Sequence, residues 1–312
     1  MEIDRRHLRK VLRRSHPKER LLDRTVRRQA WLDPIADTLQ RGIGGFYGAL
    51  GKPGMAAKNL MHGEIGLHHP LHPSLTDIPL GAWTVGVLAD WLAVATGRVP
   101  YVAGDLALAI GVAGAILAAL TGYTDFHETN GHERRTALVH GLTMTGVLVL
   151  ELVSLAMRLV QPDLRVGAIL VSTVGWLVAV TGAYVGGHLT FGLGSAVNHN
   201  AFEEGPGEFV RVGSRDDFPE GEMRRVEAAG LPVAILRRRG LLYAIGAVCS
   251  HAGGPLDEGK VEGEVVTCPW HGSQFRFTDG RVTCGPATFD QPPLAVRERG
   301  GIVEVRLAHP LR

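Results

Sequence analysis

Cysteine is scarce in this 312-residue sequence, and charge is missing from a long part of it. The three cysteines all lie in the last quarter of the chain, which excludes a disulfide framework and favours a reduced compartment or metal-bound cysteines. The formal net charge is only +2 with 21% charged residues, which excludes a disordered or collagen-like chain and one with an acidic tail. No charged residue occurs from position 166 to 201, whereas the first 30 residues carry eleven Lys or Arg against four Asp or Glu.

Four long apolar stretches follow the basic N-terminal segment, at 77–97, 105–123, 136–157 and 166–187. Each has about 19–23 residues, enough for a helix to cross ~30 Å of hydrocarbon. They lack the polar stripe of a soluble helix, and small residues recur every fourth position in the second stretch, at Ala107, Gly111, Ala115 and Ala119. We therefore expect a multi-domain membrane protein with an α-helical four-helix transmembrane bundle.

The arrangement in the membrane is predicted from the charges and the number of spans. The bundle is expected over 66–197, after a basic cytoplasmic N-terminal segment over 1–65. Basic residues favour the cytoplasmic side, and an even number of spans returns the chain to that side. The chain is thus expected in the bilayer of a bacterial cell inner membrane as a multi-pass protein with both termini cytoplasmic. The Arg-rich segment is interpreted as an orientation signal, so no nucleic-acid partner is expected.

Two acids lie within the predicted spans. Asp90 and Glu151 are in the first and third stretches, roughly 20 Å from the predicted cytoplasmic surface. A lone charge at such a depth is costly, so both are expected to be neutral, hydrogen-bonded packing groups or, alternatively, a proton relay that shares a proton.

The C-terminal part of the sequence changes to short β-branched runs. After a linker at 198–207, runs such as FVRV, LPVAILR and LLYAIG alternate with turn signals. Near the end, Gly300 and Gly301 separate two alternating runs, as in a two-residue β-hairpin. These features predict a small all-β domain over 208–312.

This domain contains two Cys-plus-His pairs, CSHAGGPL and CPWHG, which contribute Cys249, His251, Cys268 and His271. Four such side chains could bind a structural zinc ion, which is the main alternative. The two segments resemble the cluster-binding loops of the Rieske iron–sulfur family, C-x-H-x-G-x-x-L and C-P-x-H-G. The resemblance implies a 2Fe-2S cluster in which the two cysteines hold one iron and the two histidines hold the other.

Departures from the family's respiratory branch indicate a ferredoxin-like member. Ser273 matches the serine that donates a hydrogen bond to a cluster sulfur, whereas Phe275 stands at the position of a tyrosine donor. Gly254 and Trp270 replace two cysteines that form a disulfide in that branch. The resemblance therefore implies a potential in the lower or middle part of the Rieske range, roughly −150 to +300 mV. Cys284 lies outside both loops and is interpreted as a non-ligand core cysteine.

Histidines gather at the predicted cytoplasmic end of the bundle, namely His68, His69, His72, His127, His132, His140 and His188. His140 and His188 are expected at similar depth on consecutive antiparallel helices, where they could be axial ligands of a b-type haem. A quinone or other metal site and a purely interfacial role are the alternatives. The segment HPLHPSLTDIPLGAW resembles the start of an uncharacterised bacterial membrane-domain family often fused to a Rieske domain, which implies no particular chemistry.

Together these features predict a membrane-anchored Rieske electron-transfer protein. It would pass single electrons between a soluble reductase or ferredoxin and a membrane redox partner. We expect an electron carrier associated with oxidoreductases and not a stand-alone catalyst. A redox sensor and a non-catalytic subunit of a membrane reductase are the alternatives.

Overall fold

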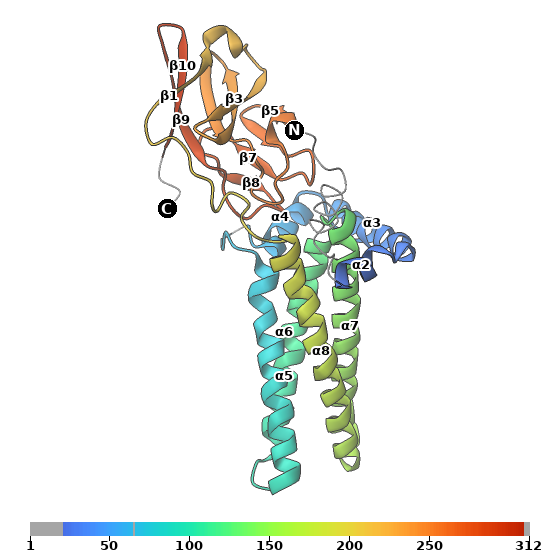
Figure 1. Cartoon of the computed structure of the whole chain (residues 1–312). Helices are drawn as coiled ribbons and strands as arrows, with labels where there is room; N and C mark the ends of the chain where they lie inside the picture. The colour runs from blue at the N-terminus through green and yellow to red at the C-terminus, as the bar shows by residue number, and fades with distance from the viewer. Residues whose placement is uncertain (1–20, 65, 309–312) are drawn as a thin grey trace, which may run out of the picture.

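The computed structural model describes residues 21–64 and 66–308, so most of the strongly basic start of the chain lies outside the described part. Four long helices stand side by side, and an all-β domain sits on one end of them (Figure 1). The predicted fold class, a helical bundle followed by a small all-β domain, is therefore confirmed.

The bundle consists of α5 (Leu71–Thr96), α6 (Tyr101–Phe126), α7 (Gly131–Val160) and α8 (Arg165–Leu193). All four helices are long and apolar enough to cross a membrane. α6, α7 and α8 each contain one predicted stretch and extend beyond both of its ends, whereas α5 starts before its stretch and ends one residue short of it, at Thr96. The helices are longer than the stretches because the apolar run marks only the part suited to hydrocarbon. The small residues predicted in α6 have a packing role: a Cβ on Gly111 would lie 2.3 Å from the Trp83 indole nitrogen.

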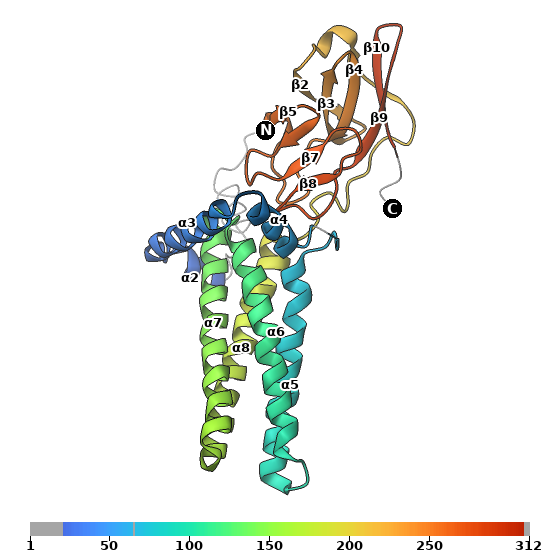
Figure 2. The same ribbon diagram turned by 180° about the vertical axis from the view of Figure 1, so that it is seen from behind.

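Three shorter helices cross the end of the bundle that carries the β domain (Figure 2). They are α2 (Leu21–Arg27), α3 (Asp33–Ala49) and α4 (Gly51–His62). α3 and α4 contain six glycines, so contacts with the bundle, more than helix propensity, stabilise them. Two such contacts are the ion pair of Asp33 with Arg135, at 2.6 Å, and the hydrogen bond of Tyr47 with Thr124, at 2.7 Å.

The β domain has two antiparallel sheets. The larger has the strand order β1-β10-β9-β4-β3-β2 and the smaller β5-β6-β7-β8. The strands are β1 (Val210–Ser214), β2 (Met223–Ala228), β3 (Leu231–Arg238), β4 (Leu241–Gly246), β5 (Lys260–Glu262), β6 (Val265–Thr267), β7 (Gln274–Arg276), β8 (Val282–Cys284), β9 (Pro293–Arg299) and β10 (Ile302–Leu307). Gly300 and Gly301 both have positive φ and join β9 to β10, which confirms the predicted hairpin.

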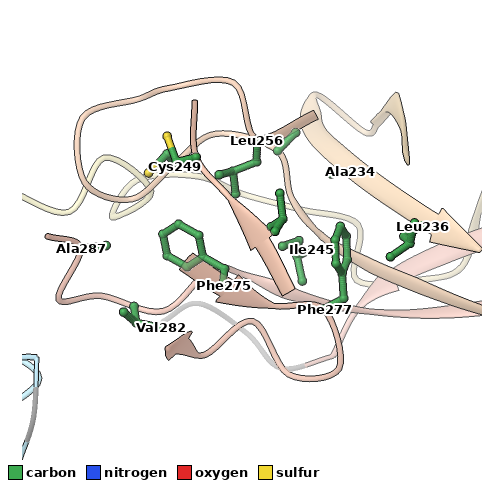
Figure 3. Packing of buried hydrophobic residues seen from close by; sticks show 12 residues of the cluster. Ala234, Leu236, Ile245, Cys249, Leu256, Phe275, Phe277, Val282 and Ala287 are labelled. Carbon is green, nitrogen blue, oxygen red and sulfur yellow. The ribbon is translucent and has the colours of Figure 1, made fainter. Parts of the chain in front are cut away.

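A buried apolar cluster fills the space between the sheets (Figure 3). Phe275 in β7 and Phe277 just after β7 pack with Ile245 and Leu236 from the larger sheet. Cys249 and Cys268 belong to the same cluster, so the core of the domain fixes the position of both thiols.

The β domain contacts α4 and the segment after α4 through the end of β8 and the residue that follows it. The Gly285 backbone N–H donates to Glu64 Oε2 over 2.9 Å, and Cys284 Sγ lies 3.7 Å from Asn59 Oδ1 in α4. The interpretation of Cys284 as a core residue is therefore wrong, because its half-buried thiol lies at the contact between the two domains. This contact holds the β domain over the histidine-rich end of the bundle.

Candidate metal centre and membrane histidines

Two loops of the β domain carry the predicted metal ligands. The first loop follows β4 and contains Cys249 and His251, and the second joins β6 to β7 and contains Cys268 and His271. In each loop the carbonyl of the cysteine accepts a hydrogen bond from a glycine four residues later, at 2.9 Å in the first loop and 3.1 Å in the second. Both glycines have φ near +78°, a conformation that other residues rarely adopt. Each loop thus contains the same type of turn, and this turn positions its Cys and His side chains.

The structure brings the four side chains together as two pairs. Cys249 and Cys268 are almost fully buried, and a hydrogen bond joins their thiols. The rings of His251 and His271 have centres 4.9 Å apart and are nearly perpendicular. Among the described residues, no three His, Cys, Asp or Glu side chains converge closely enough to hold one metal ion. This arrangement fits a two-iron cluster better than a single zinc ion with all four ligands.

The protonation states favour metal binding. The hydrogen bond between the thiols raises the pKa of Cys249 and lowers that of Cys268 to about 6. Burial, together with neighbouring imidazoles, lowers the pKa of His251 to about 3, and burial also lowers the pKa of His271. Near neutral pH both imidazoles are therefore neutral, and Cys268 is a thiolate, which are the forms that bind metals.

One ring nitrogen is left without a partner. His251 Nδ1 is fully buried and has no hydrogen bond to any described residue. Buried polar nitrogens are normally hydrogen-bonded, so an isolated one indicates a missing ligand. An imidazole that uses Nδ1 for a metal keeps Nε2 for contact with a partner.

Ser273 and Gly254 shape the space around the thiols. Ser273 is fully buried, and its Oγ accepts a hydrogen bond from the backbone N–H of Ala287 at 3.0 Å. The hydroxyl hydrogen therefore remains available to donate to a group between the loops. A Cβ on Gly254 would lie 2.9 Å from Cys268 Sγ and 3.1 Å from Trp270, so this site has no room for a larger residue.

The linker holds the first loop, which the sequence did not indicate. Asn200 Nδ2 donates to the carbonyl of Val248, and the His199 backbone N–H donates to the carbonyl of Ser250, both over 3.0 Å. These bonds lie on either side of Cys249. Asn and His are common in loops, so their presence in the linker does not predict this role. The burial of Asn200, which shows that it is structural, is visible only in the folded protein.

Comparison with known proteins identifies the β domain. The family model "Rieske [2Fe-2S] domain" matches residues 208–295. The chain is 34% identical over 91 residues to ferredoxin CarAc of Metapseudomonas resinovorans, which covers 29% of this chain and 82% of that protein. It is 33% identical over 75 residues to the ferredoxin component of the naphthalene 1,2-dioxygenase/salicylate 5-hydroxylase systems of a Ralstonia species, with 24% and 72% covered. The chain belongs to the Rieske [2Fe-2S] family.

A second family model matches the bundle. The family model "Predicted membrane protein (DUF2231)" matches residues 68–199, which include the four long helices. Among solved structures, the ferredoxin of carbazole 1,9a-dioxygenase from Nocardioides aromaticivorans is 29% identical, with 32% of this chain and 97% of that chain covered and a TM-score of 0.31. The Rieske domain is thus an electron-transfer domain for a 2Fe-2S cluster, joined to helices that could span a membrane.

The membrane histidines are not paired as predicted. His140 Nδ1 donates to the carbonyl of Gly182 at 2.9 Å, and its ring faces His72. His188 Nε2 instead contacts Asp23 Oδ1 in α2 at 2.6 Å. Haem ligation by His140 and His188 is therefore not supported. The prediction failed because sequence gives the depth of a residue on a helix but not the rotation of the helix about its axis.

Of the two intramembrane acids, Asp90 differs from the prediction because it is ion-paired, whereas Glu151 forms a hydrogen bond as expected. Asp90 does not share a proton with Glu151, because both of its oxygens contact the guanidinium of Arg158, at 2.6 and 3.1 Å. Asp90 and Arg158 are almost completely buried and form an ion pair between the C-terminal parts of α5 and α7. Glu151 Oε2 instead accepts a hydrogen bond from Ser172 at 2.7 Å.

Proposed function

We propose that this protein is a membrane-anchored Rieske electron carrier in which Cys249 and Cys268 bind one iron and His251 and His271 bind the other. The observation that supports this most directly is the pairing of the side chains, with two hydrogen-bonded buried thiols and two neutral imidazoles 4.9 Å apart. The buried, unpartnered Nδ1 of His251 is then an iron ligand. A cluster with two irons uses ligands in two pairs, as they are found here.

When bound, the 2Fe-2S cluster takes up or releases one electron. The protein sets how easily this occurs. Two neutral imidazoles in place of two thiolates make the site less negative and favour reduction. The Ser273 hydroxyl, whose oxygen already accepts a bond from Ala287, donates its hydrogen to a cluster sulfur and stabilises the reduced state further.

The four long helices anchor the Rieske domain in the inner membrane of a bacterial cell. Their length and apolar character support this location. The basic N-terminal segment supports a cytoplasmic N-terminus, and four spans would return the Rieske domain to the same side. The lipid bilayer is then one partner, and the domain faces soluble cytoplasmic proteins.

The redox partners are a soluble reductase or ferredoxin on one side and a membrane redox partner on the other. Trp270, which is 55% exposed, lies beside the half-buried ring of His271. An exposed aromatic residue at the edge of a redox site is suited to contact with another protein. The relatives are named as ferredoxin components of dioxygenase systems, which supports an exchange of electrons with protein partners.

The ligand assignment is tested on the full chain purified in detergent. We expect iron and acid-labile sulfide in equal amounts and a Rieske-type EPR signal after reduction. His251→Ala and His271→Ala should each abolish the signal, whereas Cys284→Ser should keep it because Cys284 lies at the domain contact. Zinc without iron, or an unchanged signal in His271→Ala, would overturn the assignment.

Location and role need separate measurements. A reporter fused to the C-terminus should report the cytoplasm, and a periplasmic signal would contradict the orientation. Rapid reoxidation of the reduced protein by a membrane acceptor supports a carrier. A change in partner binding with redox state, without such turnover, would support a sensor.

A further inference from the structure

Two histidines face each other within the bundle, at its end nearest the Rieske domain. His72 lies in the first turn of α5 and His140 lies in α7, and their ring centres are 6.1 Å apart at an interplanar angle of 73°. Both rings line a cavity of about 500 Å³ that extends between the Rieske domain and the helices. His188 is not among the residues that line this cavity. The two facing histidines that line this cavity are therefore His72 and His140.

Hydrogen bonds fix the same tautomer in both rings. His72 Nδ1 donates to the carbonyl of Ala118 at 2.8 Å, and His140 Nδ1 donates to the carbonyl of Gly182 at 2.9 Å. A carbonyl oxygen only accepts, so Nδ1 carries the hydrogen and Nε2 keeps a free lone pair. Neither Nε2 forms a hydrogen bond with any described residue. Histidines that bind metals are typically oriented in this way, through a bond from the other nitrogen to a carbonyl.

The same arrangement of a histidine and a carbonyl occurs in two pairs of helices, α5 with α6 and α7 with α8. On the partner helix, four residues after the carbonyl that holds each ring, there is a glycine: Gly122 for His72 and Gly186 for His140. A Cβ on Gly122 would lie 2.7 Å from His72 Cε1, and one on Gly186 would lie 2.8 Å from His140 Cε1. Both glycines thus leave the space that the rings occupy. The repetition indicates a built site and not a chance contact between two side chains.

The cavity has the size and lining of a cofactor site. Pockets that hold small molecules and cofactors measure about 300–1,000 Å³ and are mostly apolar. This one is lined by apolar residues from all four helices, among them Leu80, Ala115, Met144 and Ala183. Trp83 also lines it, and its buried indole nitrogen has no hydrogen-bond partner among the described residues.

The distance between the two ring centres fits a metal ion held between the two imidazoles. An imidazole nitrogen binds a metal at about 2 Å and the ring centre lies about 1 Å further out, so two imidazoles on opposite sides of one metal have centres ~6 Å apart. No third His, Cys, Asp or Glu joins the pair within the described chain. The remaining ligands must then come from the cofactor itself, as in a porphyrin. We propose that His72 and His140 are the axial ligands of a b-type haem bound in this cavity.

The haem site would face the cluster. His251 and Phe289 of the Rieske domain line the same cavity as His72 and His140. If the cluster is bound as proposed above, one electron leaves the reduced cluster and converts ferric haem iron to ferrous, or the reverse, and no further reactant is needed. The haem is then the first membrane redox partner of the cluster and is carried on the same chain. The haem site itself does not depend on the cluster.

The test uses the full chain, expressed in a host that is replete with haem and purified in detergent. Visible spectra of the oxidised and reduced protein, together with extraction of the haem, should show one haem per chain and a sharp α band on reduction. His72→Ala and His140→Ala should each lower the haem content at least tenfold. His188→Ala is the matched control and should keep the haem, because this ring contacts Asp23 instead.

Two further variants separate ligation from loss of the fold. His140→Gly should lose haem and regain it when free imidazole is added, because imidazole can fill the vacated ligand position. Gly186→Ala should shift the spectrum or lower the haem content, because the added methyl displaces the His140 ring without removing it. Failure of imidazole to restore haem to His140→Gly, while that protein remains folded by circular dichroism, would contradict axial ligation.

The remaining outcomes are equally decisive. A wild-type protein that contains no haem and does not bind added hemin overturns the proposal, even if it binds a short-chain quinone. Loss of haem in His188→Ala together with retention in His72→Ala also overturns it. His251→Ala should lose the Rieske EPR signal and keep the α band, so failure of the cluster assignment and failure of the haem site are distinguishable.

Discussion

The backbone N–H of Gly285 donates to the Glu64 carboxylate over 2.9 Å, and this bond connects the Rieske domain to the segment between α4 and α5. The carboxylate is largely buried, and burial raises its pKa, although the Gly285 bond and the nearby His62 and His68 oppose the rise. A contact between the Rieske domain and the helical part of the chain thus involves a carboxyl group whose ionisation is disfavoured by burial.

The stability of the docked structure should therefore depend on pH. A carboxyl group whose pKa is raised in the folded state contributes stability at low pH that is lost as the pH rises through the folded value. Glu64→Gln keeps an oxygen that accepts from Gly285 but cannot ionise. Thermal unfolding from about pH 4 to pH 8 should show a stability difference between wild type and Glu64→Gln that changes with pH. The exposed Glu227→Gln is the control, and a difference that is constant over this range would contradict the prediction.

The ion pair of Asp90 and Arg158 should be costly to break from one side only. Arg158→Met leaves the Asp90 carboxylate buried without its partner, and such a change typically costs about 3–5 kcal/mol. The double variant with Asp90→Leu should recover much of this stability, since Asp105 keeps Arg165 as a partner. Unfolding in detergent measures the effect, and Lys260→Ala, which breaks an exposed pair with Glu262, should cost less than about 1 kcal/mol. Equal losses in the single and double variants would show that the pair is not coupled.

Removal of the Ser273 hydroxyl should lower the reduction potential of the cluster. One hydrogen bond that favours the reduced state is worth roughly 1 kcal/mol, which for one electron corresponds to about 40 mV. Ser273→Ala should show this decrease in a redox titration followed by EPR, with the signal shape retained. Thr283→Val, an exposed hydroxyl on β8, should leave the potential unchanged. A potential unaffected by Ser273→Ala would mean that the hydroxyl does not donate to the cluster.

Gly254 should not tolerate a side chain. Gly254→Ala places a Cβ 2.9 Å from Cys268 Sγ, and overpacking of this kind costs about 1–3 kcal/mol. We expect lower iron content per chain and a lower melting temperature. Gly207→Ala is the matched control, because its Cβ would meet no atom within 4 Å and its φ is not positive. Equal iron content in both variants would contradict a steric role for Gly254.

The elements that sequence predicted well depend on local signals. The length and apolar character of the four spans are properties of each segment, as is the double glycine between β9 and β10. Each of the two loops that contain Cys249 and Cys268 is a short, continuous motif, so a metal site could be predicted from the sequence alone.

The relationships that sequence missed join distant residues. His188 contacts Asp23 across 165 positions, and Asp90 contacts Arg158 across 68. Such pairs depend on how each helix is rotated and on where the short helices α2 to α4 lie, and a hydropathy pattern specifies neither. The pairing of His72 with His140 likewise required the helices to be placed in space.

The bond between Gly285 and Glu64 also has a kinetic consequence. A ferredoxin that is a separate protein meets its acceptor by diffusion, so its rate depends on the concentrations of both molecules. A tethered and docked domain meets its acceptor at an effective concentration that the linker and the contact determine, commonly in the millimolar range for short linkers. For the haem proposed on the same chain, the rate constant of electron transfer from the cluster should therefore not depend on how many copies of the protein a cell contains.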